Sequence, residues 1–180
     1  MSKIGKKTIV LPKESSIKID GANLTITGPK GSKTLTINDK IFSSKLVESE
    51  FQLQPLEKKI DKKTSIMWGT YRSLINNAVQ GVSKGHEKIL ELNGVGFRAN
   101  LKGESLNLQI GFSHDVNFKI PKDIKITVEK QTIIKIIGVD KELVSKIAAD
   151  IKNLKPVEPY KAKGIKEKGQ FVLRKEGKKK

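Results

Sequence analysis

The sequence predicts an α+β protein built from two similar small domains, each an antiparallel-rich sheet with one amphipathic helix packed on a face. Short segments alternate apolar and polar residues with period two, and Gly or Pro separates them, which is typical of antiparallel strands. Each series of such segments is followed by one stretch of helical period. This order occurs twice in 180 residues. About 70–85 residues for each repeat suffice for a small core under one helix.

The first quarter of the chain contains the first series of expected strands. Ile9–Leu11 opens it, and Gly28-Pro29 and Gly31 mark a tight turn within it. Apolar residues then occupy alternate positions at Ile17 and Ile19, Leu24 and Ile26, Leu35 and Ile37, and Phe51 and Leu53.

Residues 64–82 predict an amphipathic helix of about five turns. Thr64 or Ser65 is expected to cap its start, and Gly85 lies just past its end. The apolar positions at helical spacing are Met67, Tyr71, Leu74, Ala78 and Val82, with Ile75 and Val79 beside them. The other face is uncharged and consists of Thr70, Ser73, Asn76, Asn77 and Gln80.

Residues 84–154 repeat this plan. Strands are expected from Val95 to Leu101 and at four later alternating segments, and Asp140 is placed to cap a second helix. The strand segments centre on Leu106–Ile110, Val116–Phe118, Ile124–Val128 and Ile134–Ile136, and the helix positions are Leu143, Ile147, Ile151 and Leu154. A faint echo links Ile17-Lys18-Ile19 with Ile124-Lys125-Ile126. The expected boundaries are 1–83 and 84–154 for the two domains, and 155–180 for a basic tail.

The charge of the chain predicts a polyanionic partner. Lys and Arg number 36 against 19 Asp and Glu, a net charge of +17. Residues 155–180 hold ten of the cations and three of the acids, net +7, and end in Lys178–Lys180. Such a block is typical of an arm that binds nucleic acid, and a solvated terminus is the alternative.

Composition excludes several other classes of protein. The chain has no cysteine, which removes disulfide scaffolds, thiolate metal sites and cysteine nucleophiles. No apolar run approaches the 18 or more residues of a membrane span, and the first twelve residues lack the apolar region of a secretory signal. We therefore expect a soluble intracellular protein.

Three motifs are candidates for catalytic or cofactor chemistry. Gly94–Ala99 matches the G-x-G-x-x-A dinucleotide fingerprint and follows a strand, but the next residues alternate as a strand where the fingerprint needs a helix. Ser113-His114-Asp115 contains the residue types of a hydrolase triad, but consecutive side chains cannot converge. His86 and His114 are the only histidines, a poor basis for a metal site. We expect no enzyme activity, no cofactor and no metal.

The tail combines features that suit contact with RNA. Pro156 and Pro159 end the preceding helix and favour extended backbone. Tyr160 offers a flat ring that can stack on a base or pack back on its own domain, and both alternatives stay open. Gly164 permits close approach of the main chain to a phosphate backbone. Lysines that can follow such a backbone are Lys161, Lys163 and Lys166.

Pro159–Lys166, PYKAKGIK, resembles the P-Y-K-G-K-G-I-R signature of the sixth protein of the bacterial-type large ribosomal subunit. Ala162 stands where the signature has glycine, Lys166 stands for arginine, and Phe97 and Phe112 replace usual tyrosines. Further segments resemble this family in the same order, so that the resemblance covers nearly the whole chain. They are 2–7, 28–31, 69–74, 81–82, 92–99, 111–114 and 175–179.

The resemblance implies a structural component of the large subunit that binds large-subunit ribosomal RNA and supports the region near the translation-factor site. It implies neighbouring ribosomal proteins as partners, translation factors in passing, no membrane, and a cytoplasmic, ribosome-bound location. Heavy use of Lys, Ile and Asn also allows an organellar ribosome. The RNA-binding residues expected from charge and resemblance are Lys3, Lys6, Lys7, Arg98, His114, Lys155, Tyr160, Lys161, Lys163, Gly164, Lys166, Lys168, Arg174, Lys175, Lys178, Lys179 and Lys180.

Other classes of function make different predictions. A nucleic-acid-binding regulator outside the ribosome would bind isolated sites and occur as a free pool. An enzyme would gather His114 or paired acids in a pocket. A membrane-surface protein would need a helix with a cationic polar face, whereas residues 64–82 have a neutral one.

Overall fold

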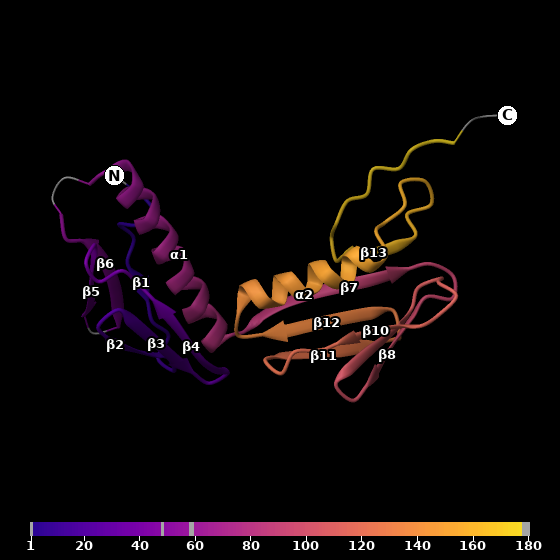
Figure 1. The fold of residues 1–180 in the computed structure, drawn as a ribbon, viewed down its shortest axis with the longest axis horizontal. Coiled ribbons are helices and arrows are strands. Elements are labelled where there is room, and N and C mark those ends of the chain that lie inside the picture. The colour runs from indigo at the N-terminus through magenta and orange to yellow at the C-terminus, as the bar shows by residue number, and fades with distance from the viewer. Residues whose placement is uncertain (1, 48, 58–59, 178–180) are drawn as a thin grey trace. The chain divides into compact units, whose positions relative to one another are not determined.

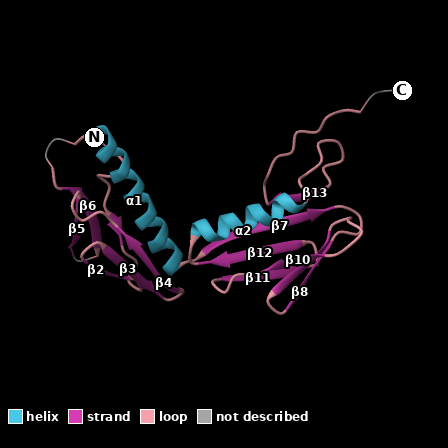
Figure 2. Ribbon diagram, viewed as in Figure 1, coloured by secondary structure: helices cyan, strands magenta, loops and turns pink. Residues whose placement is uncertain are grey.

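The computed structural model describes residues 2–47, 49–57 and 60–177. The chain forms two compact units. The first contains the described residues up to Gly85 together with Val139–Lys141, and the second contains His86–Gly138 and the described residues from Glu142 onward. Each unit combines antiparallel strands with one helix (Figure 2). The predicted α+β class is therefore confirmed.

The first unit has two three-stranded antiparallel sheets and the helix α1, Lys62–Ser83. One sheet has the strand order β1-β6-β5 and the other β2-β3-β4. The strands are β1 (Ile9–Val10), β2 (Ser16–Asp20), β3 (Asn23–Gly28), β4 (Gly31–Thr36), β5 (Phe42–Val47) and β6 (Glu50–Pro55). Strand β5 was not among those expected from the sequence.

The core of the first unit lies between these strands and one face of α1. Trp68 is 5% exposed and its indole Nε1 donates a hydrogen bond to the carbonyl of Leu53 at 2.7 Å. Ile75 and Val79 on the same face are buried, whereas Leu74 is only half-buried. The buried face thus includes Trp68, which the predicted stripe did not contain, while Ala78 and Val82 are buried as predicted.

Both ends of α1 are defined by the backbone. The helix begins at Lys62 with Asp61 in extended conformation as the N-cap, and no side-chain bond closes it. The expectation that Thr64 or Ser65 caps the start was therefore wrong, since both lie inside the first turns. Gly85 follows the helix with φ +81°, and its N–H donates to Gln80 O at 3.2 Å, as a C-terminal glycine does.

The second unit has a three-stranded sheet of order β10-β9-β8 and a four-stranded sheet of order β11-β12-β7-β13. Its helix α2, Lys141–Leu154, buries the predicted Ile147 and Ile151. The strands are β7 (His86–Asn93), β8 (Arg98–Lys102), β9 (Ser105–Gln109), β10 (Val116–Lys119), β11 (Ile124–Glu129), β12 (Ile133–Gly138) and β13 (Gly164–Glu167). Asp140 directly precedes α2, as expected, and its carboxylate pairs with Lys33.

The two units share one topology. The order β1-β6-β5 in the first unit corresponds to β7-β12-β11 in the second, and β2-β3-β4 corresponds to β8-β9-β10. This confirms the predicted duplication. The echo between residues 17–19 and 124–126 is out of register, however, because β2 corresponds to β8 and not to β11. Any hairpin with period-two alternation produces that pattern.

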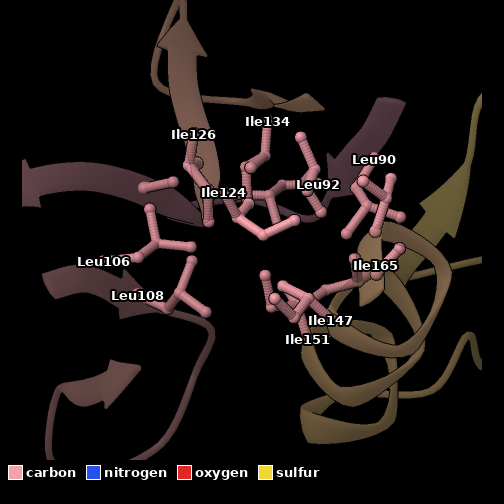
Figure 3. Close-up of a cluster of buried hydrophobic side chains, with 14 of the residues drawn as sticks. Leu90, Leu92, Leu106, Leu108, Ile124, Ile126, Ile134, Ile147, Ile151 and Ile165 are labelled. Atoms are coloured by element: carbon pink, nitrogen blue, oxygen red, sulfur yellow. The ribbon is translucent and has the colours of Figure 1, made fainter. Parts of the chain in front are cut away.

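The second unit contains β13, a strand that has no counterpart among the described residues of the first unit. Gly164–Glu167 pairs antiparallel with β7 at the edge of the sheet, with Ile165 opposite Leu92. Ile165 is fully buried, and Figure 3 shows it in the cluster that contains Leu90, Ile147 and Ile151. Part of the expected tail 155–180 is therefore built into the second unit. Among the described residues, neither helix has the length and apolar character that a membrane crossing requires.

Candidate nucleic-acid interface

Several connections of the second unit meet at one end of its four-stranded sheet (Figure 1). Gly164, at the start of β13, lies opposite Asn93, the last residue of β7. The N–H of Ala99, in β8, donates to Gln131 O at 2.8 Å, which joins the β11–β12 turn to β8. We call this region the loop end. It consists of residues 94–98, 110–115, 130–131 and 155–163.

The segment after α2 forms a closed hairpin loop at the loop end, where the sequence predicted an extended arm. The N–H of Glu158 donates to Lys163 O at 2.8 Å, and the N–H of Ile165 donates to Lys155 O at 2.9 Å. Tyr160 is 53% exposed, so it lies outside the core of the second unit. The loop therefore presents Tyr160 on a backbone that is already closed.

Exposed cations lie near Tyr160 along the chain and on the segment bonded to its loop. Lys161 and Lys163 are exposed on the hairpin loop, and the N–H of Lys175 donates to Pro159 O at 3.0 Å. That bond holds the C-terminal segment beside the loop, and Arg174 and Lys175 are exposed there. Lys178–Lys180 lie outside the described residues.

Gly164 has an internal role that the sequence did not reveal. Its φ is +139°, and an added Cβ would lie 2.6 Å from Pro156 O and 2.7 Å from Val157 Cα. A side chain at this position would therefore collide with backbone of the same hairpin. The closest main-chain neighbours of Gly164 belong to its own chain, which accounts for the glycine without an RNA contact.

Lys166 and Lys168 lie on β13 and just after it. Lys166 Nζ is 3.0 Å from Glu91 Oε2 on β7, so its charge is already paired. Lys168 is exposed, and its N–H donates to Ile89 O at 2.9 Å. Of these two side chains, Lys168 is the one free to meet a phosphate without leaving an ion pair that the structure contains.

Glu167 forms ion pairs with two further lysines, one on β7 and one on α2. Its carboxylate lies 2.9 Å from Lys88 Nζ and 3.5 Å from Lys152 Nζ. The hydrogen bond from Lys88, helped by both lysine charges, holds the pKa of Glu167 below its ordinary value despite partial burial. These contacts fasten β13 to β7 and α2.

Two predicted residues, His114 and Lys155, meet through Phe112. The ring centroids of Phe112 and His114 are 6.2 Å apart with an interplanar angle of 15°. Lys155 Nζ lies 4.7 Å from the centroid of Phe112, within the range of a cation–π interaction. A second exposed aromatic group with an adjacent cation therefore lies at the loop end.

The β7–β8 and β11–β12 connections add residues that the sequence analysis missed. Val95 was predicted to begin a strand, but it lies in the loop before β8 and is 95% exposed. Lys130 and Gln131 both have positive φ, 53° and 59°, and form the turn between β11 and β12. Positive φ at both central positions is typical of a tight hairpin turn. An Asn-Gly pair in the sequence would have predicted such a turn, whereas Lys-Gln does not. Arg98 is exposed beside this turn.

The N-terminal candidates belong to the first unit. Lys3, Lys6 and Lys7 are all exposed, and Arg72 donates from Nε to the carbonyl of Lys7 at 3.3 Å. They form a separate basic segment, whose part in RNA binding stays a prediction.

The structure also bears on the alternative chemistries. Gly94–Ala99 leads into the strand β8, and not into the helix that a dinucleotide fingerprint requires. Within residues 2–47, 49–57 and 60–177, no three His, Asp or Glu side chains are grouped as a metal site would need. His114 stacks on Phe112, and Asp115 accepts a hydrogen bond from Gln109 at 3.4 Å.

Exposed lysines and arginines beside exposed aromatic rings are typical of surfaces that contact nucleic acid. The family model for ribosomal protein L6 matches the chain twice, over residues 11–85 and 93–168. The second match includes the hairpin loop and β13. The chain belongs to this family, and it is a ribosomal protein of the large subunit.

Individual relatives match over almost the full length of the chain. Large ribosomal subunit protein uL6 of Staphylococcus carnosus is 48% identical over 178 residues, which are 99% of this chain and 98% of the relative. Large ribosomal subunit protein uL6 of Beijerinckia indica is 44% identical over 180 residues, and that of Sphingopyxis alaskensis is 42% identical over 180 residues, all of both chains in each case.

Proposed function

We propose that this protein binds large-subunit ribosomal RNA through the loop end and supports the RNA near the translation-factor site. The observation that carries the proposal is the placement of exposed cations from separate segments on one end of the second unit. They are Arg98 from β8, Lys130 from the β11–β12 turn, and Lys161 and Lys163 from the hairpin loop. Ribosome-bound location and neighbouring ribosomal proteins as partners follow from the same proposal.

The mechanism is structural. Lysine and arginine side chains neutralise phosphates and set the position of the protein, while the shape of the folded RNA selects the site. The hairpin loop is closed by its own hydrogen bonds, so its ordering entropy is spent on folding and little is lost on binding. The first unit then stays available for contacts with neighbouring proteins.

The absence of cysteine from the sequence permits a direct test. A single cysteine introduced as Glu158→Cys, in the hairpin loop, carries an iron chelate that cleaves nearby RNA by hydroxyl radicals. We expect cleavage of large-subunit RNA next to the translation-factor site in reconstituted subunits. The matched control is Lys18→Cys on β2, an exposed position of the first unit, which we expect to give a different cleavage pattern.

Sedimentation distinguishes the proposal from a regulator outside the ribosome. The endogenous protein should co-sediment with large subunits, resist a moderate salt wash, and be released by nuclease. A mostly free pool in low-salt lysate would contradict the proposal and favour the regulator. Cleavage by the Glu158→Cys chelate far from the factor site would contradict only the proposed location.

A further inference from the structure

The β9–β10 connection, residues 110–115, carries an exposed aromatic ring with a second ring and a cation beside it. Phe112 is 46% exposed, and the ring of His114 lies nearly parallel to it. Lys155 directly follows α2 in the sequence, and its ammonium group lies over the Phe112 ring. We call these three side chains the Phe112 platform.

Residues of the second unit support the loop that carries the Phe112 platform. Ile110 is 1% exposed and belongs to the core of the second unit, which anchors the start of the loop. Gln109 and Asp115 bond to each other across its base at 3.4 Å. An added Cβ on Gly111 would lie 3.3 Å from the ring of Phe97, so the loop also sits on that ring. Phe112 is thus exposed on a supported loop.

Flat rings of this kind have one main use on an RNA-binding surface. In an RNA helix each base face is covered by the next base, so only an unpaired base offers a free face. Such a base stacks on aromatic side chains with little dependence on its identity, and a neighbouring cation attracts its phosphate. Lys155 beside Phe112 supplies that cation.

We propose that the Phe112 platform binds one unpaired nucleobase of its RNA partner by stacking. This inference rests on the proposed RNA binding and adds the class of nucleotide that the site takes. It assigns Phe112, a residue absent from the predicted set, the stacking contact, and gives Lys155 and His114 the flanking positions. Base-paired RNA elsewhere is then contacted through its phosphates and its shape.

The test uses the full-length protein and two RNA probes at one salt concentration. The first probe is a short RNA duplex that carries one bulged 2-aminopurine nucleotide, and the second is the same duplex fully paired. We expect the unmodified protein to prefer the bulged duplex on the order of tenfold. Stacking on Phe112 should also change the fluorescence of the bulged 2-aminopurine.

Three variants separate stacking from other effects. Phe112→Leu keeps an apolar side chain without a ring, and it should abolish the preference while the affinity for the paired duplex stays the same. Phe112→Trp restores a ring and should retain the preference. Phe171→Leu changes another exposed phenylalanine, 85% exposed, and should have no effect. Because Phe112 is itself exposed, its variants should keep the thermal midpoint of the parent.

The possible outcomes are distinct. An equal preference in Phe112→Leu and the unmodified protein overturns the platform, and so does paired-duplex binding without any preference. Either result leaves the proposed RNA binding intact. If the protein binds neither duplex nor deproteinised large-subunit RNA, the proposed function itself is contradicted, and the proposed stacking on Phe112 is contradicted as well.

Discussion

Lys166 Nζ lies 3.0 Å from Glu91 Oε2, and the two residues are directly opposite each other in the β13–β7 pair. In the sequence, Lys166 is equivalent to Lys161 and Lys163 as a candidate for contact with phosphate. The structure separates them, because the two loop lysines are exposed and the strand lysine is paired with a carboxylate. This difference can be measured.

The salt dependence of RNA binding should distinguish these lysines. Replacing Lys161 and Lys163 together by Gln should lower the slope of log affinity against log salt by about two, using roughly 0.9 for each phosphate neutralised. Adding Lys166→Gln should lower the slope further by much less than one, because Glu91 already neutralises the charge of Lys166. Filter binding to a large-subunit RNA fragment across a salt series measures the slope. An equal decrement for Lys166 would show that its ion pair opens on the RNA.

Removing β13 should destabilise the second unit. The boundary expected from the sequence lies after Leu154, whereas β13 pairs with β7 beyond it. Ile165 is fully buried in the core, so Ile165→Ala should cost about 2–5 kcal/mol, and truncation after Leu154 should cost at least as much.

Urea unfolding followed by two probes locates this damage. Trp68 is the only tryptophan and lies in the first unit, so its fluorescence reports on that unit. Far-ultraviolet circular dichroism reports on both units. We expect the truncation to lower the dichroism midpoint and to shift the fluorescence midpoint less. Unchanged midpoints by both probes would restore the boundary after Leu154.

Ala162 has a left-handed backbone conformation that glycine tolerates better. Its φ is +56°, at the position where the resemblance expects glycine. A left-handed conformation costs a non-glycine residue about 1–2 kcal/mol. Ala162→Gly should therefore stabilise the protein by about 1 kcal/mol in chemical denaturation. The matched control is Gly169→Ala at φ +81°, where no atom would crowd the added Cβ. The two substitutions should have opposite signs, and a destabilised Ala162→Gly would contradict the strain.

The lowered pKa of Glu167 gives a pH-dependent contribution to stability. Because the pKa is lower in the folded protein, the contribution is fully present above the ordinary glutamate value of about 4.3. It is lost as the pH falls through the folded pKa. Glu167→Gln should therefore destabilise the protein at pH 7, by less than about 1 kcal/mol because the group is partly exposed.

The difference in stability between Glu167→Gln and the unmodified protein should vanish at acidic pH, where Glu167 is protonated. Urea midpoints measured at intervals from pH 7 to about 3 test this. Lys88 provides the main hydrogen bond to Glu167, so the same comparison in a Lys88→Gln background should show a smaller pH-dependent difference. A difference that grows as the pH falls would reverse the sign of the effect and rule out the ion pair as its cause.

The periodicity of the sequence predicted most of the fold because strand and helix patterns are local. Period-two alternation located β2, β3 and β4, and helical spacing located α2 and the body of α1. Two of the local features that the sequence did not predict correctly have identifiable reasons. Val95 continues the alternation of β8 but lies in a loop between two glycines, and Lys130-Gln131 forms a turn without turn-forming residues.

The sequence by itself determined the class of fold, its duplication, the excess of positive charge and the family resemblance, since composition, period and motif order are all readable along the chain. Only the tertiary structure decided what the segment after Leu154 does. Its strand contains a single buried apolar residue, Ile165, so no local pattern separates it from a charged tail. The contacts that define it, Lys166 with Glu91 and Lys155 with Phe112, join residues far apart in sequence, and such pairing depends on the packing of the whole unit.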